Sequence, residues 1–151
     1  TMKYFETEIL LVEDNLHEAK LTILSLKEHS FANKLIHVTD GAEALDFIFS
    51  KRKYEERPAA DIPKLILLDL HLPKINGFQV LKEVKNNRLT KAIPVIILTS
   101  SQEDRDIVEG YELGANSYIV KPVEFESFAK AVYEVGLYWL HLNQKPIRGF
   151  S

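Results

Sequence analysis

Residues 64–74, KLILLDLHLPK, form the stretch that decides the fold of this chain. The consecutive apolar residues 65–68 are typical of a strand buried on both faces, as in a parallel sheet flanked by helices. Pro73 has no N–H to donate to a sheet and marks the exit from the strand. Asp69 is therefore predicted near the carboxyl end of a central strand, where open α/β sheets bind their ligands.

Other apolar runs along the chain alternate with helical patterns. The predicted strands cover residues 8–12, 35–38, 65–68, 94–99 and 117–120, and the last helix is predicted from about residue 124 to 142. This order predicts an α/β fold with a doubly wound, five-stranded parallel sheet and an extended C-terminal helix. One domain is expected over residues 8–143, followed by a tail, 144–151, that is too short to be an output domain.

Composition limits the classes of function. The chain has 151 residues, a net charge of −3 and no cysteine, which excludes disulfides, thiolate catalysis and cysteine-ligated metal centres. No apolar run approaches the roughly 20 residues that span a bilayer, and the first residues lack the apolar core of a signal peptide. We expect a cytoplasmic protein that binds neither nucleic acid nor membranes.

Polar residues follow four of the predicted strands. Because the carboxyl ends of these strands meet at one edge of the sheet, the fold brings together Glu13, Asp14, Asp69, Thr99 and Lys121. Carboxylates that share a cleft repel one another unless a cation or a proton compensates them. Oxygen ligands without histidine or thiolate favour Mg²⁺, and Lys121 and Thr99 suit an anion. The set indicates phosphoryl transfer with Asp69 as the nucleophile.

Each of these residues also has a plain structural explanation when it is taken alone. Glu13 and Asp14 could cap a helix, Thr99 could bond to the backbone at the end of its strand, and Lys121 could be a surface charge. Their placement together at one edge of the sheet favours a functional site.

At these residues the chain resembles the receiver domain of two-component response regulators, a flavodoxin-like (βα)5 fold. The matching segments are LLVEDN (10–15), LILLDLHLPKINGF (65–78), VIILTSS (95–101) and GANSYIVKPV (114–123). The resemblance implies that Asp69 accepts a phosphoryl group from a phosphohistidine on a sensor histidine kinase. It also implies a phosphoacceptor with slow self-dephosphorylation rather than an enzyme.

The resemblance assigns further roles around Asp69. Thr99 and Lys121 would bind the phosphoryl group, and Tyr118 would be the switch aromatic whose rotamer reports phosphorylation. The Lys121–Pro122 bond is often cis in this family. Mg²⁺ would be held by Glu13, Asp14, Asp69 and the backbone carbonyl of His71.

Two features narrow the resemblance to small regulators paired with cyanobacterial phytochromes. The interval from Asp14 to Asp69 is longer than in a minimal receiver, and the excess falls in the charged stretch 51–62, which we expect to be an exposed helix end and loop. The ending, 128–146, also resembles those regulators, which implies a phytochrome-like kinase as the partner. His71 stands where a small or amide residue is common, so the chain departs from the family pattern at this edge of the site.

The C-terminal helix carries more apolar residues than one face can hold. The sheet-facing positions follow a 3-4-3-4-3 spacing: Phe125, Phe128, Val132, Val135, Trp139 and Leu142. The residues left over are predicted to form a homodimer interface together with neighbouring elements: Tyr133, Leu137, Tyr138 and Leu140.

Three other readings compete with a phosphorylatable receiver. Phosphatases that form an aspartyl-phosphate usually carry a second Asp two residues after the first, where this chain has His71. A flavodoxin-like cofactor binder would need a Ser/Thr/Gly-rich loop after the first strand, where Glu13 and Asp14 would repel phosphate, and no GxxxxGK or GxGxxG is present. A receiver-like module that works without phosphorylation is disfavoured because every acidic and switch position is present.

Overall fold

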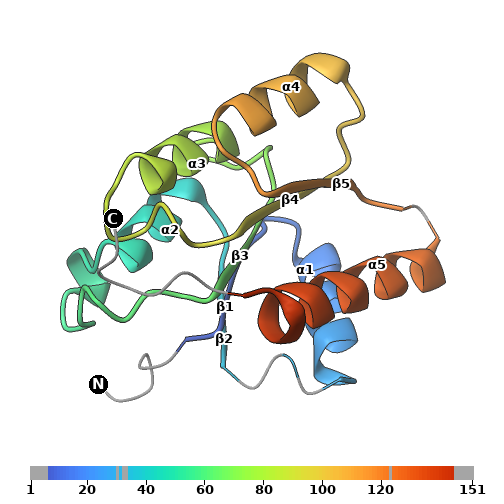
Figure 1. Ribbon diagram of the computed structural model, residues 1–151, viewed down its shortest axis with the longest axis horizontal. Helices are drawn as coiled ribbons and strands as arrows, with labels where there is room; N and C mark the ends of the chain where they lie inside the picture. The colour runs from blue at the N-terminus through green and yellow to red at the C-terminus, as the bar shows by residue number, and fades with distance from the viewer. Residues whose placement is uncertain (1–6, 30, 32–33, 123, 145–151) are drawn as a thin grey trace.

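A computed structural model describes residues 7–29, 31, 34–122 and 124–144. Its parallel sheet has the strand order β2-β1-β3-β4-β5 (Figure 1). The strands are β1 (Ile9–Val12), β2 (Leu35–Val38), β3 (Leu65–Leu68), β4 (Val95–Thr99) and β5 (Ser117–Val120). The predicted doubly wound parallel sheet is confirmed, and each predicted strand end lies within one residue of the observed one.

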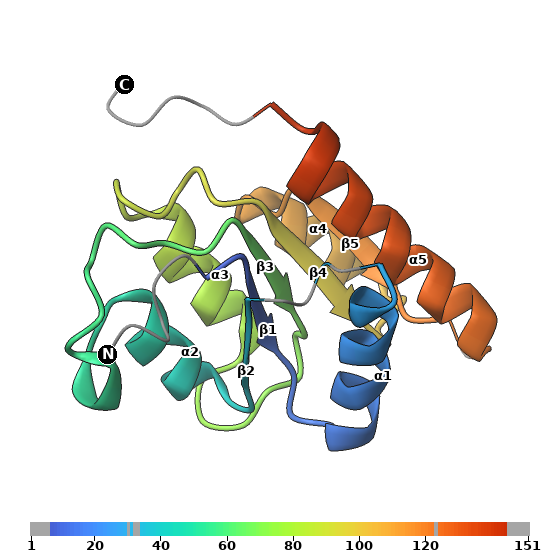
Figure 2. The ribbon, with the colours of Figure 1, turned by 90° about the horizontal axis from the view of Figure 1, so that it is seen from below.

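The helices cover both faces of the sheet. On one face lie α1 (Leu16–Lys27) and α5 (Phe125–Leu137), and on the other lie α2 (Gly41–Ile48), α3 (Gly77–Lys85) and α4 (Asp104–Glu112), as Figures 1 and 2 show. Within the described ranges, no helix has the length and hydropathy that crossing a bilayer requires.

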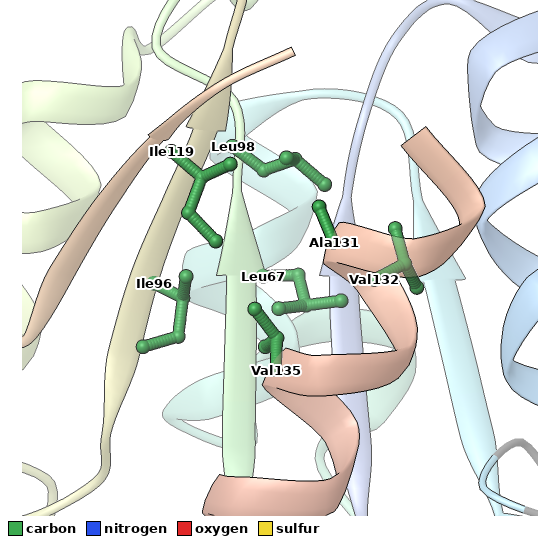
Figure 3. A pocket seen from close by; sticks show the side chains of 7 residues that line it. All are labelled: Leu67, Ile96, Leu98, Ile119, Ala131, Val132 and Val135. Carbon is green, nitrogen blue, oxygen red and sulfur yellow. The ribbon is translucent and has the colours of Figure 1, made fainter. Parts of the chain in front are cut away.

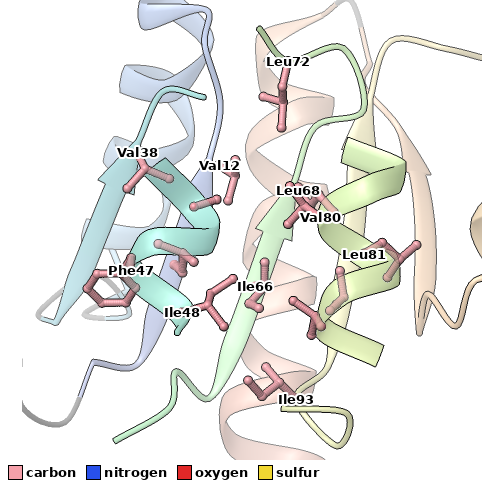
Figure 4. Close-up of a cluster of buried hydrophobic side chains, with 14 of the residues drawn as sticks. Val12, Val38, Phe47, Ile48, Ile66, Leu68, Leu72, Val80, Leu81 and Ile93 are labelled. Carbon is pink, nitrogen blue, oxygen red and sulfur yellow. The ribbon is translucent and has the colours of Figure 1, made fainter. Parts of the chain in front are cut away.

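Double burial explains why the central strands are apolar at every position. Ile66 and Leu68 of β3 point into the cluster beneath α2 and α3 (Figure 4). Leu65 and Leu67 point to the opposite side, where Leu67 lies against α5 (Figure 3). Successive side chains of a strand alternate between its faces, so a strand covered on both sides needs a continuous apolar run.

Side-chain caps start three of the helices, α1, α2 and α3. Asn15, Asp40 and Asn76 each accept a hydrogen bond from the N–H three residues later, at 3.0, 2.7 and 3.0 Å. These bonds satisfy N–H groups that have no partner inside the helix. The cap of α1 is thus Asn15, which removes helix capping as the explanation for Glu13 and Asp14.

The charged stretch 51–62 is less exposed than its sequence predicts. It contains a 3₁₀ turn, Arg52–Tyr54, and two buried side chains, Tyr54 and Arg57. The Tyr54 hydroxyl donates to Glu43 of α2 at 2.6 Å, and the guanidinium of Arg57 lies 4.1 Å from the ring centroid of Phe47. The hydrogen bond of Tyr54 and the cation–π contact of Arg57 anchor this stretch on α2. Each depends on a single side chain, so neither contact produces a periodic pattern in the sequence.

The C-terminal helix also departs from the prediction. After α5 the chain forms a π-helical turn, Tyr138–Leu142, in which the Asn143 N–H donates to the Tyr138 carbonyl at 2.7 Å. The wider turn shifts the register of every later side chain, so a uniform α-helical spacing fails beyond residue 137. All but the first residue of the predicted tail, 144–151, lies outside the described residues.

Candidate functional site

The site lies at the carboxyl edge of the sheet, where Asp69 directly follows β3. The Asp69 N–H donates to the carbonyl of Val12 at 3.0 Å, which fixes Asp69 beside the end of β1. The strand order reverses between β1 and β3, and open α/β sheets bind ligands at such a switch point.

Three carboxylates form a cluster that suits a divalent cation. One oxygen from each of Glu13, Asp14 and Asp69 lies within 4.8 Å of the others, and within the described part of the chain these residues form the only such group of possible metal ligands. Glu13 and Asp69 are buried while Asp14 is exposed, so the cluster is open to water on one side. Clustered carboxylate oxygens are the ligands that hard divalent cations prefer, so these residues fit a metal.

Glu13 is held from two directions. Its Oε2 accepts the Asn15 N–H at 3.1 Å, and its backbone carbonyl lies 2.8 Å from Nε2 of His37 on β2, so that ring nitrogen donates. Burial raises the pKa of Glu13 to about 7, the negative charge of Asp69 adds to this, and the hydrogen bond from Lys121 opposes it. A cation beside Glu13, in addition to Lys121, would therefore stabilise its ionised form.

Lys121, just after β5, reaches across the cluster. Its Nζ donates to Glu13 Oε1 at 2.6 Å and to Glu18 Oε1, and lies 3.4 Å from Asp69 Oδ2. Burial alone would lower the pKa of Lys121, but the hydrogen bonds with Glu13 and Glu18 raise it above its ordinary value. Lys121 therefore places a positive charge next to Asp69.

The two oxygens of Asp69 have different surroundings. Oδ1 accepts the backbone N–H of Leu70 at 2.7 Å and lies 3.4 Å from the backbone N of His71. Oδ2 faces Lys121. The hydrogen bonds from the backbone orient the Asp69 carboxylate, and this carboxylate stays beside those of Glu13 and Asp14.

Thr99 and Tyr118 lie on the neighbouring strands. Thr99, the last residue of β4, is fully buried, and its Oγ1 lies 3.5 Å from the backbone N of Ser101. The hydroxyl of Tyr118 on β5 donates to the Ser101 carbonyl at 3.0 Å, and burial raises the pKa of Tyr118. One short loop after β4 thus connects the phosphoryl-binding hydroxyl predicted for Thr99 with the switch residue predicted for Tyr118.

His71 is exposed beside this loop. Its side chain lines an open hollow together with Ser100, Ser101, Gln102 and further residues of the loop and the start of α4. The role of its backbone carbonyl as a metal ligand stays a prediction. The Lys121–Pro122 bond is trans, since the described residues contain no cis peptide bond, so the cis bond suggested by the resemblance is absent. Trans is the lower-energy form of such a bond by about 0.5–1 kcal/mol.

Sequence reasoning missed Glu18. Its carboxylate belongs to the first turn of α1, yet it contacts Lys121, which is 103 residues away. The acid at the third helical position after the Asn15 cap could be noticed in the sequence, but that pattern indicates only a helix start.

The predicted dimer residues divide between partly buried and exposed positions. Tyr133, Leu137 and Leu140 pack against the cluster between α1, α5 and the sheet, whereas Tyr138 is exposed. Tyr133 stacks on Phe31 with ring centroids 5.9 Å apart and also contacts the ring of His29, so these two residues cover a second face of α5.

The predicted sheet-facing set is wrong at its two ends, because Phe125 and Leu142 are 50% and 62% exposed. Phe125 is the first residue of α5, and Leu142 closes the π-helical turn that changes the register. The middle of the helix follows the predicted face.

Comparisons with known proteins identify the family. Residues 9–133 match the family model of the response regulator receiver domain. A probable methanogenesis regulatory protein, FilR2 of Methanothrix harundinacea, is 38% identical over 91% of this chain and 86% of its own length. The response regulator Rcp1 of Synechocystis is 39% identical over 91% of this chain and 92% of its own length.

Solved structures agree with the sequence match. The Mn²⁺-bound form of Rcp1 superposes with a TM-score of 0.85 at 38% identity, covering 93% of this chain and 99% of that one. The phosphorylated cyanobacterial phytochrome response regulator RcpA superposes with a TM-score of 0.86 at 33% identity, covering 94% and 99%. The chain belongs to the response regulator receiver domain family.

Proposed function

We propose that this protein accepts a phosphoryl group on Asp69 from the phosphohistidine of a sensor histidine kinase. One observation carries the proposal: the oriented Asp69 carboxylate has Lys121 on one side and Glu13 and Asp14 within 4.8 Å. In the transfer, an Asp69 oxygen forms a bond to phosphorus while the phosphorus–nitrogen bond to the histidine breaks, and the imidazole leaves with that electron pair. Lys121 lies where it can balance the negative charge of the transferred group.

We assign the metal as Mg²⁺, held by Glu13, Asp14, Asp69 and the His71 carbonyl. The all-oxygen donor set and the exposed side of the cluster support a cation that keeps several waters. When bound by these residues, Mg²⁺ would supply charge neutralisation for phosphoryl transfer. The Mn²⁺-bound form of the relative Rcp1 is consistent with a divalent cation in this family.

The switch is proposed to pass through the loop after β4. Thr99 would bond a phosphoryl oxygen, which draws the loop toward Asp69. Tyr118 would respond because its hydroxyl is bonded to the Ser101 carbonyl of that loop. Receiver domains in general are not enzymes, and we propose slow self-dephosphorylation as the step that resets the switch.

The proposed partners are a phytochrome-type kinase and a second copy of the chain. The similarity to RcpA supports the kinase, since RcpA is a cyanobacterial phytochrome response regulator. The exposed ring of Tyr138, with Trp139, lines an open hollow between α5 and β5, which supports a dimer surface at this side of the fold. A cytoplasmic location fits this kind of signalling.

Phosphorylation can be tested on the full chain with Mg²⁺ and phosphoramidate. Intact-mass measurement should show one added phosphoryl group that is stable in acid and labile in base. The adduct should be absent from Asp69→Asn and from samples treated with a chelator, and it should remain in Asp104→Asn, a matched control on α4.

The competing functions predict different results. A phosphatase would hydrolyse the donor with many turnovers, and a phosphorylation-independent module would give no adduct. An adduct that persists in Asp69→Asn would contradict the proposal. The exposed His71 at the position of the missing acid argues against the phosphatase.

A further inference from the structure

Lys121 has three carboxylate neighbours, and one of them has no role in the proposed chemistry. Asp69 is the proposed phosphoacceptor and Glu13 a proposed metal ligand, but Glu18 is neither. Glu18 comes from α1 rather than from the sheet edge, and its Oε1 accepts a hydrogen bond from Lys121 Nζ. Its contact with the ammonium therefore needs a separate explanation.

The fold delivers Glu18 to this position through the start of α1. The cap residue Asn15 follows the acidic pair, and its side chain binds the Glu18 N–H at 3.0 Å. The first turn of α1 therefore lies beside Lys121. The side chain of Glu18 is 35% exposed, against 7% for Lys121 and 4% for Glu13, so Glu18 covers Lys121 on the side that faces water.

The number of donors on Lys121 limits what it can bind. An ammonium group has three N–H bonds, and the three carboxylates occupy them all. When a phosphoryl oxygen approaches Lys121, one carboxylate must release it.

Glu18 is the carboxylate that is released most easily. Glu13 also accepts the Asn15 N–H, and Asp69 also accepts the Leu70 N–H, so both are held by the backbone. Among the described residues, Lys121 is the sole hydrogen-bond donor to the Glu18 carboxylate. Because Glu18 is partly exposed, water can replace Lys121 as its partner with little desolvation penalty.

We propose that Glu18 is a positioning residue that holds Lys121 in the unphosphorylated pocket and is exchanged for the phosphoryl group. This inference rests on the proposed function. No covalent bond changes in the exchange: Lys121 leaves the Glu18 carboxylate, which becomes hydrated, and donates to a phosphoryl oxygen. Glu18 thus weakens binding of the phosphoryl group by competing for its cationic partner.

The test uses BeF₃⁻, a phosphoryl mimic, with Mg²⁺ and the full chain, and measures affinity by ¹⁹F NMR. Glu18→Gln should bind BeF₃⁻ about fivefold more tightly than the wild type, because Lys121 no longer has to leave an ionised partner. Glu28→Gln, the same change at the far end of α1, should leave the affinity unchanged. Circular dichroism checks that the variants are folded.

Glu18→Asp separates direct contact from general charge repulsion. The aspartate keeps the negative charge and the acid in the first turn, but it is one methylene too short to hold Lys121 in the same way. If Glu18 acts through contact, Glu18→Asp should resemble Glu18→Gln, and both effects should persist at about 0.5 M salt, which screens distant charges. If Glu18→Asp binds BeF₃⁻ with the affinity of the wild type, or if Glu18→Gln does not change that affinity, the proposed exchange of Glu18 for the phosphoryl group is wrong.

The two proposals fail in different ways. A wild-type chain that takes neither BeF₃⁻ nor a phosphoryl group would overturn the proposed function. A wild-type chain that takes both, with Glu18→Gln unchanged, would overturn the role of Glu18 alone.

Discussion

Gly77, the first residue of α3, lies against the backbone of the proposed phosphoacceptor. A Cβ atom at this position would lie 2.3 Å from the carbonyl oxygen of Asp69 and 2.7 Å from Cα of Leu70. Backbone atoms cannot rotate away as the end of a side chain can. The close approach lets the Gly77 N–H donate to the Leu70 carbonyl at 2.9 Å, so α3 fixes the turn that carries Asp69.

We therefore predict that Gly77→Ala displaces Asp69. The forced shift should lower the free energy of unfolding by about 1–3 kcal/mol and slow phosphorylation by phosphoramidate. Urea denaturation and intact-mass kinetics measure the two effects. Gly114→Ala is the control, because that residue has φ +107 and its substitution strains the chain away from the site. A Gly77→Ala protein with wild-type stability and rate would contradict the prediction.

At the residue scale, the sequence identifies site residues that end strands. Glu13, Asp69, Thr99 and Lys121 could be predicted because buried apolar runs mark the strands, and parallel strands bring their ends together. Glu18 could not, because it lies inside a helix and meets Lys121 only through the tertiary fold. A single sequence carries no local signal for that contact.

At the scale of elements, Lys85 joins α3 to the segments that lead into β4 and β5. Its Nζ donates to the carbonyls of Ile93 and Lys91 at 2.7 and 3.1 Å, and to the side-chain oxygen of Asn116 at 3.0 Å. Asn116 in turn accepts the N–H of Val95 at the start of β4. Burial lowers the pKa of Lys85 from 10.5 to about 8.

This pKa predicts how stability varies with pH. Between pH 8 and 10.5 the unfolded chain holds the Lys85 proton and the folded chain has released it. Raising the pH through this window therefore increases the free energy of unfolding. The stability of the wild type relative to Lys85→Met should therefore increase across this window, measured by urea denaturation at several pH values. Lys82 is an exposed lysine of the same helix, so Lys82→Met shows the effect of removing one positive charge without removing a buried lysine. A difference that narrows across the window would refute the assignment.

The sequence predicts helices and strands well where buried residues recur at regular spacing. It predicts them poorly where a single contact determines the local conformation. The strands were predictable because each is covered on both faces. The stretch 51–62 was not, because Tyr54 and Arg57 anchor it through isolated contacts with α2. The end of the last helix was not, because the π-helical turn at Tyr138–Leu142 breaks the spacing from which its faces were assigned.

At the scale of the whole molecule, the proposed switch and the proposed dimer surface are connected through β5. Tyr118 lies on this strand and bonds to the loop after β4, while Ser117 and Ile119 of the same strand line the hollow with Tyr138. On α4, Val108 and Tyr111 are also exposed. A second copy that covers this side would thus contact the elements next to the switch.

We predict that Tyr138→Ala weakens dimerisation about tenfold, since a half-exposed tyrosine that becomes buried on association is a typical hot spot. Sedimentation velocity over a range of concentrations, with and without BeF₃⁻ and Mg²⁺, gives the dissociation constants. Leu89→Ala removes a similarly exposed apolar side chain from the connection between α3 and β4 and should leave association unchanged. A wild type that stays monomeric in both states would exclude the dimer, and equal effects of the two variants would place its interface elsewhere.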